Sequence, residues 1–171
     1  MRPAKRIAVC GLTVALATVF LLLGGVIGVG TYIMPLLAGF LLLPAGRAYG
    51  WKYHLLLWIA ASILTLLLTP DLEEGLMFLC FFGWYPAARP GLERLGQPWR
   101  WAAKLLAFNA ALAVAEGVLY FLTVGEGTEG LWLLVVFWVL MNVVFLLYDT
   151  LVPRAEQLYE RRLKSALHLD R

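Results

Sequence analysis

Short segments that carry most of the charged residues divide the chain into six apolar runs. A membrane-spanning helix needs about 20 mainly apolar residues, or somewhat fewer where the bilayer thins or flanking side chains snorkel. We expect helices over residues 7–28, 32–45, 53–68, 102–124 and 131–148, and a further one from 70 or 72 to 86. The pattern therefore predicts an all-α, polytopic membrane protein with six transmembrane helices.

Composition supports a membrane environment. The 171 residues are 62% hydrophobic and only 15% charged, whereas roughly 25% charged residues are usual in a water-soluble domain. So much apolar surface cannot be buried inside a chain of this size. We expect a multi-pass protein of the cell membrane, with the lipid bilayer as its first partner.

The distribution of basic residues predicts the topology. If the N-terminus is cytoplasmic, all fourteen Lys and Arg residues fall on the cytoplasmic side, as the positive-inside rule requires. The predicted outer loops, at about 29–31, 69–74 and 125–130, contain none. Both termini are therefore expected in the cytoplasm. The net charge of +3 reflects this bias, and we expect no nucleic-acid partner.

The last 19 residues differ from the rest of the chain. Residues 1–152 are expected to form the six-helix transmembrane domain, and residues 153–171, which follow the last apolar run, a cytoplasmic amphipathic helix. Its Leu158, Leu163 and Leu167 oppose Arg161 and Arg162. Such a helix either lies on the anionic inner leaflet or docks a cytoplasmic partner.

Three carboxylates, of Asp71, Glu73 and Glu74, lie between the third and fourth apolar runs. Thr69 or Asp71 can cap the fourth helix, and Asp71 and Glu74 have the spacing of a capping box. The other interpretation is electrostatic. A cluster with no basic residue nearby attracts a cationic solute or ion to the outer mouth of the protein.

Polar residues inside the predicted spans are costly and usually face protein or water. Glu116 lies in the fifth run, and Asn109 precedes it by seven residues on nearly the same face. Asn142 in the sixth run is expected at the depth of Asn109, so the two asparagines can pair. The pair is either a hydrogen-bonded link between helices or part of a solute site. The candidate solute-binding residues are Glu116, Asn109, Asn142, Tyr120 and Glu73.

Two further features concern contacts at the inner surface and along the first helix. Asp149 and Arg47 end the sixth and second runs at comparable depth, so they either pair or are solvated separately. Ala8, Gly11 and Ala15 place small side chains on one face of the first helix, where another helix can approach closely. That neighbour is either another helix of this chain or a second protein.

Sequence signatures of enzymes are absent. There is no His-Glu-x-x-His, Gly-x-Ser-x-Gly, phosphate-binding glycine loop or Cys/His metal spacing. Cys10 and Cys80 are expected to be small buried apolar residues, and His54 and His168 lack a catalytic neighbourhood. We therefore expect no enzyme activity, no cofactor and no metal ligands.

The six short predicted helices, the cytoplasmic termini and the small-residue face at Gly11 and Ala15 resemble the substrate-binding S components of energy-coupling factor transporters. The resemblance implies that Ala8, Gly11 and Ala15 contact a membrane coupling subunit, which works with ATPases, and that solute binds in the outward half. The first outer loop, "VGTY", is much shorter than that family's lid. The stretches "GWYP" and "NVVFLLYD" also resemble small uncharacterised membrane proteins of Gram-positive bacteria.

Two functions are consistent with these observations. The first is a solute- or ion-binding membrane subunit of a transport system, without an ATPase of its own. The alternative is a membrane scaffold or regulatory subunit that transports nothing and docks other proteins through its first helix and C-terminal segment.

Overall fold

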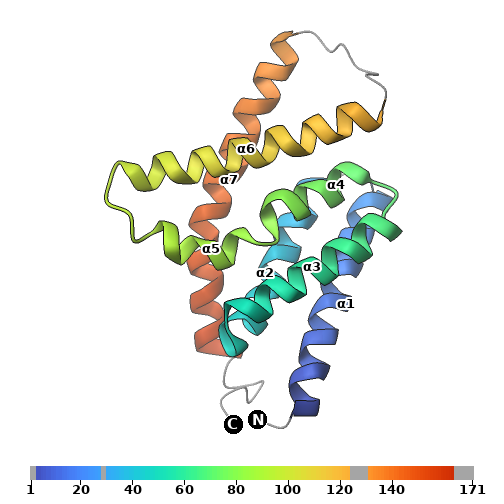
Figure 1. Cartoon of the computed structure of the whole chain (residues 1–171), viewed down its shortest axis with the longest axis vertical. Coiled ribbons are helices and arrows are strands. Elements are labelled where there is room, and N and C mark those ends of the chain that lie inside the picture. The colour runs from blue at the N-terminus through green and yellow to red at the C-terminus, as the bar shows by residue number, and fades with distance from the viewer. Residues whose placement is uncertain (1–2, 28–29, 124–130, 164–171) are drawn as a thin grey trace.

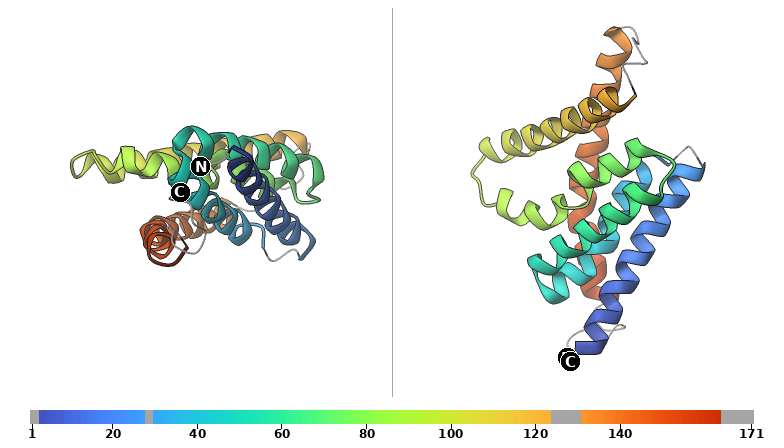
Figure 2. Two further views of the ribbon diagram at one scale, coloured as in Figure 1. Left: turned by 90° about the horizontal axis from the view of Figure 1, so that it is seen from below. Right: turned by 45° about the vertical axis from the view of Figure 1, so that its right-hand side comes forward.

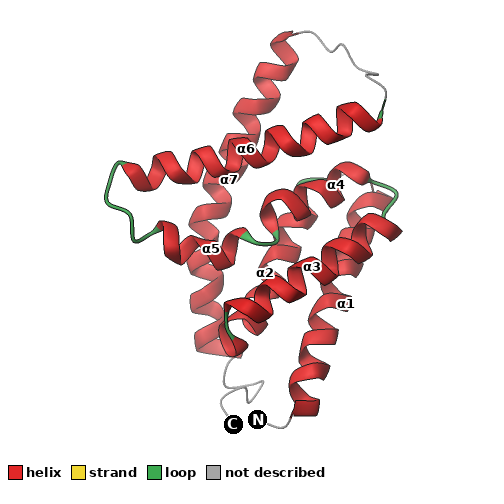
Figure 3. Ribbon diagram, viewed as in Figure 1, coloured by secondary structure: helices red, strands yellow, loops and turns green. Residues whose placement is uncertain are grey.

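The computed structural model describes residues 3–27, 30–123 and 131–163. These residues form helices joined by short connections, with no strand among them (Figures 1 and 3). The elements in chain order are α1 (Pro3–Ile27), α2 (Ile33–Tyr49), α3 (Trp51–Leu68), α4 (Leu72–Met77), the π-helix η1 (Phe78–Phe82), α5 (Tyr85–Leu92), α6 (Trp99–Leu122), α7 (Leu131–Leu158) and the π-helix η2 (Tyr159–Leu163). The predicted all-α class is confirmed.

Four helices are long and apolar enough to cross a membrane: α1, α3, α6 and α7. Only 22 to 28% of the residues in the most apolar window of each are buried within the protein, so most of this apolar surface faces outward. Such a surface indicates a protein that contacts lipid. Of the other two predicted spans, the second forms the 17-residue α2 and the fourth forms the interrupted series α4, η1 and α5.

The helix ends gather on two sides of the molecule. In Figure 1 the start of α1, the α2–α3 junction and the end of α7 lie toward the bottom, and the α5–α6 connection lies at the left. Toward the upper right lie the end of α1, the α3–α4 turn, the end of α6 and the start of α7, and the rotated view on the right of Figure 2 agrees. We call the first set of segments the basic end, because it contains the described lysines and arginines. We call the second set the acidic end, because it contains residues Asp71 to Glu74.

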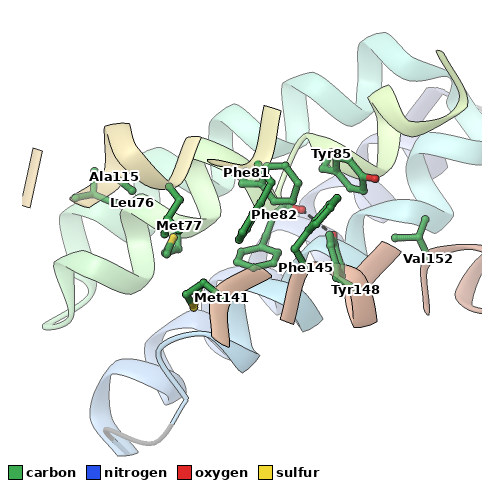
Figure 4. Packing of buried hydrophobic residues seen from close by; sticks show 12 residues of the cluster. Leu76, Met77, Phe81, Phe82, Tyr85, Ala115, Met141, Phe145, Tyr148 and Val152 are labelled. Atoms are coloured by element: carbon green, nitrogen blue, oxygen red, sulfur yellow. Dashed lines mark hydrogen bonds between the residues drawn. The ribbon is translucent and has the colours of Figure 1, made fainter. Parts of the chain in front are cut away.

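The core consists of two apolar clusters. Small and aliphatic side chains of α1, α2 and α3, such as Ala17, Ala38 and Ala61, pack together in one. Aromatic rings dominate the other, where the segment from η1 to α5 faces α6 and α7 (Figure 4). The rings of Phe108 and Phe145 stack at 4.8 Å with their planes 12° apart. This packing holds the interrupted helix between the two groups of long helices.

The interruption at η1 frees backbone carbonyl groups, and side chains donate hydrogen bonds to them. Nε1 of Trp84 donates to the carbonyl of Cys80 at 2.7 Å, and the hydroxyl of Tyr148 donates to that of Phe82 at 2.9 Å. The buried ring of His54 bonds through Nε2 to the carbonyl of Gly83 at 2.8 Å. Because a lipid environment offers no water to these carbonyls, the three donors stabilise the break.

A buried ion network joins α5, α6 and α7 at the basic end. Lys104, only 1% exposed, places Nζ 2.8 Å from Oδ2 of Asp149 and 2.5 Å from Oε1 of Glu93. Arg89 lies 2.9 Å from both carboxylates, and the hydroxyl of Tyr85 donates to Asp149 at 2.5 Å. The hydrogen bond from Lys104 lowers the pKa of Glu93 below its ordinary value.

Neither alternative given for Arg47 and Asp149, pairing or separate solvation, is found. Arg47 pairs with Glu156 at 2.5 Å, and Asp149 belongs to the network of Lys104 and Arg89. The prediction failed because it ended the last helix near residue 148. In the structure α7 runs on to Leu158, so Asp149 is buried inside the bundle and Glu156, about two turns later, reaches Arg47.

The C-terminal segment does not start with a new helix at residue 153. Pro153 lies within α7, and the chain continues as helix through η2 to Leu163. The described part of the predicted amphipathic segment is therefore continuous with the last membrane helix. Residues 164–171, including Lys164 and Leu167, lie outside the described residues.

Replacing Lys104 should destabilise the fold strongly. Lys104→Met removes the buried cation between Asp149 and Glu93, and breaking a buried ion pair from one side typically costs about 3 to 5 kcal/mol. We expect a loss of this size in the free energy of unfolding, measured by equilibrium unfolding in detergent micelles. Arg154→Met, at an exposed position of α7, is the matched control, and an equally small effect of both substitutions would contradict the assignment.

Candidate functional site

The acidic end is built around the start of α4. Asp71 caps this helix: its Oδ1 accepts a hydrogen bond from the backbone N–H of Glu74 at 3.2 Å. Its Oδ2 accepts one from the hydroxyl of Thr31 at 2.7 Å. The hydroxyl of Thr69 accepts from the backbone N–H of Asp71 at 3.2 Å, so the side chain of Glu74 does not complete a capping box. The prediction that Asp71 caps this helix is confirmed.

Glu73 and Glu116 come together with Tyr32, which precedes α2. The hydroxyl of Tyr32 donates to Glu73, and Glu116 lies within electrostatic range of both residues. Burial and the hydrogen bond to Glu73 raise the pKa of Tyr32 above its ordinary value, so this phenol remains a proton donor. We call Tyr32, Glu73 and Glu116 the acidic mouth. Three segments of the chain supply its side chains.

Glu116 has no hydrogen bond from either asparagine. Its Oε1 is buried without a partner, and Asn142 bonds elsewhere. The side-chain amides of Asn109 and Asn142 donate to each other's oxygens at 2.9 and 3.1 Å. Each also donates to a backbone carbonyl of its own helix, Leu105 or Trp138. The predicted contact between the asparagines is confirmed, and it links α6 to α7.

The other predicted solute-binding residues are not part of the acidic mouth. Tyr120 is 64% exposed on α6, and the asparagine pair lies about two helical turns, roughly 10 Å, from Glu116 along α6. Of the five candidates, Glu73 and Glu116 belong to the acidic mouth, and Asn109 and Asn142 form a separate pair. A role in solute binding for Asn109, Asn142 and Tyr120 stays a prediction.

Sequence reasoning missed the most deeply buried acid at this end, Glu74. Its side chain is 0% exposed, and neither carboxylate oxygen has a hydrogen-bond partner. The backbone amide of Gly25 faces it without a well-formed bond. The carboxylate packs against Gly24 of α1, where an added Cβ would come within 2.1 Å of Oε1. The one available signal was the adjacent pair of glycines, Gly24 and Gly25, which follows three leucines near the end of the helix.

The small-residue face of α1 is open. Ala8, Gly11 and Ala15 are exposed, and a Cβ added at Gly11 would meet nothing within 4 Å. Gly11 and Ala15 line an apolar groove of about 530 Å³ between α1 and α3. Helix α3 forms the other wall of the groove, and the described chain leaves the small residues themselves exposed. Gly24 instead packs inside the protein against Glu74 and Met34.

A smaller pocket of about 330 Å³ lies at the basic end, between the α2–α3 junction and α5. Its polar lining residues, Arg47 and His54, are engaged with Glu156 and with the carbonyl of Gly83. Cys10 and Cys80 are free and only partly buried. Among the described residues, no group of three or more His, Cys, Asp or Glu side chains is arranged to hold a metal ion.

Removing the cap of α4 should have a modest, measurable cost. Asp71→Ala deletes the acceptor for the backbone N–H of Glu74, and loss of an N-cap typically costs about 1 kcal/mol. Asp71→Asn keeps a capping oxygen, so we expect it to retain most of the stability. Equilibrium unfolding in detergent micelles measures both, and equal losses in the two variants would contradict the capping role.

Comparison with known proteins found no matching family model, no matching curated protein and no matching solved structure. The function is therefore argued from the residues and geometry of this chain.

Proposed function

We propose that the protein is a six-pass membrane subunit that binds a cationic solute or ion at its outer side and acts with partner subunits in transport. In this proposal the acidic end faces outward and both termini are cytoplasmic. The chain carries no phosphate-binding motif, so energy would come from partners. The acidic mouth is the binding site.

The observation that carries the proposal is that no basic side chain pairs with the acidic mouth among the residues that the structure describes. The ion pairs of the described chain all lie at the basic end, where they involve Glu93, Asp149 and Glu156. Glu116 lies within electrostatic range of Glu73, so these like charges repel each other, and the hydroxyl of Tyr32 donates to Glu73. A bound cation would offset this repulsion, since opposite charges attract strongly where water is scarce.

The open groove on α1 supports a partner subunit. Gly11 and Ala15 leave room for a second helix to approach α1 closely, and in lipid such close packing is a main source of helix association. Resemblance to the S components of energy-coupling factor transporters suggests a membrane coupling subunit at this face, with ATPases attached to it. The very short connection between α1 and α2 differs from that family and argues against a lid over the solute.

The alternative is a scaffold or regulatory subunit without a solute. The same exposed face of Ala8, Gly11 and Ala15 supports it, because a docking helix needs no transport function. Purification from the native membrane distinguishes the two. Stoichiometric protein partners together with no affinity for any cation favour the scaffold, whereas cation binding by the isolated chain favours the transport subunit.

The six-pass topology predicts opposite accessibility at the two ends of α6. Thr123 and Gly96 are exposed and flank this helix. After Cys10 and Cys80 are replaced by alanine, a single cysteine at Thr123 should react with an impermeant maleimide applied to intact cells. A single cysteine at Gly96 should react only after permeabilisation. Labelling of both from the same side would overturn the topology.

Glu116→Gln should weaken cation binding at least tenfold without unfolding the protein. Glutamine keeps the shape and hydrogen-bonding capacity of Glu116 and removes the charge that attracts the ligand. Choline, agmatine and spermidine serve as quaternary ammonium, guanidinium and polyamine probes, and ligand-induced shifts in Tm measure their affinities. The Tm without ligand should stay close to that of the wild type.

Glu160→Gln is the matched control, because Glu160 is an exposed carboxylate at the basic end. It should bind every probe as the wild type does. Failure of the wild type to bind any of the probes, or unchanged affinity in Glu116→Gln, would contradict the proposed solute site.

A further inference from the structure

The apolar groove of about 530 Å³ lies between α1 and α3, which run side by side in Figure 1. The buried side chains of Val14 and Leu57 form its floor, and the exposed side chains of Ile7 and Leu56 border it. Gly11, where an added Cβ would meet nothing within 4 Å, leaves space along α1. An apolar hollow in a surface that contacts lipid suits a hydrocarbon chain.

The groove extends over about half the thickness of a membrane. Both helices start at the basic end, and the lining residues run from Arg6 to Ala15 on α1 and from Tyr53 to Leu64 on α3. With a rise of about 1.5 Å per residue, these stretches are roughly 14 and 16 Å long. The hydrocarbon core of a bilayer is about 30 Å thick, so one leaflet takes up about 15 Å. The groove therefore matches an acyl chain of the leaflet at the basic end.

A cation lies at the end of the groove nearest the basic end. The guanidinium carbon of Arg6 lies 4.9 Å from the centre of the Tyr53 ring. The carboxylates of Glu93, Asp149 and Glu156 pair with other basic side chains, and no carboxylate of the described chain pairs with Arg6. Its charge is therefore available to an anion at the mouth of the groove.

Charge complementarity selects an anionic phospholipid as the occupant. A guanidinium binds phosphate strongly through paired N–H donors. Lys5 and Lys52 belong to the first turns of the same two helices, so the electrostatic potential at this end is positive. A zwitterionic headgroup brings an ammonium group that this potential repels, whereas an anionic headgroup does not. An apolar helix of a partner protein would leave Arg6 without an anion.

We propose that the groove binds one anionic phospholipid, with an acyl chain along Gly11 and Ala15 and the phosphate at Arg6. A lipid and a helix cannot fill the groove together, so a partner subunit that docks on this face has to displace the lipid. The lipid site does not depend on the solute proposed for the acidic mouth.

Native mass spectrometry of the purified chain, released from detergent micelles, tests the site. The chain is titrated with dioleoylphosphatidylglycerol, which is anionic, or with dioleoylphosphatidylcholine, which has the same acyl chains and no net charge. We expect one retained phosphatidylglycerol, bound about tenfold more tightly than phosphatidylcholine, as one charged hydrogen-bonded contact provides. Arg6→Gln should lower the affinity for phosphatidylglycerol to that for phosphatidylcholine.

Two matched controls separate the groove from the rest of the surface. Arg94→Gln changes another exposed arginine of the basic end, one that does not line the groove, and it should bind phosphatidylglycerol as the wild type does. Gly11→Leu fills the groove at a position with open space, so it should fold and bind both lipids more weakly. Gly117→Leu, on α6, is its control, because an added Cβ there also meets nothing within 4 Å.

Three results would overturn the proposal. The first is equal affinity of the wild type for the two lipids. The second is an equal loss of phosphatidylglycerol binding in Arg6→Gln and Arg94→Gln, which would indicate a diffuse attraction by the whole basic end. The third is unchanged lipid binding in Gly11→Leu. If that variant instead loses a protein that co-purifies with the wild type from the native membrane, the groove belongs to a partner helix.

Discussion

The need to pair backbone carbonyls inside a lipid environment governs how this chain is arranged. The fourth apolar segment breaks at η1, and a broken helix is tolerated at membrane depth only when other groups satisfy its backbone. His54 from α3 and Tyr148 from α7 bond to the carbonyls of Gly83 and Phe82. These two bonds tie helices on both sides of the protein to the break. The aromatic cluster around Phe81 and Phe145 then fills the space that the break leaves.

The break also separates two different electrostatic environments. Beyond η1, α5 carries Arg89 into the network that neutralises Asp149 and Glu93. Before η1, α4 carries Glu73 and Glu74 toward α1, α2 and α6, where the described chain supplies no basic side chain. One short interrupted segment thus links a neutralised ion network to a set of uncompensated acids. That asymmetry is the physical basis of the proposed solute site.

Neighbouring acids of α4 differ in their access to solvent, and this difference decides which of them a solute can reach. At the acidic mouth, Glu116 and Glu73 are only partly buried, so an organic cation can reach them. Glu74 is fully buried, and its carboxylate packs against Gly24 of α1. The segment α4 thus places Glu73 and Glu74 in neighbouring but different environments.

The sequence by itself determined the properties that depend on local spacing. The apolar runs predicted the all-α class and the long helices, the spacing before α4 predicted the cap at Asp71, and equal depth on antiparallel helices predicted the pairing of Asn109 with Asn142. Only the tertiary structure decided which charges meet. Arg47 reaches Glu156 because α7 continues past Pro153, and Glu74 is buried because Gly24 lets α1 approach α4. These contacts join residues far apart in the chain. Helix length and close packing control the contacts, and no local sequence pattern encodes either of these.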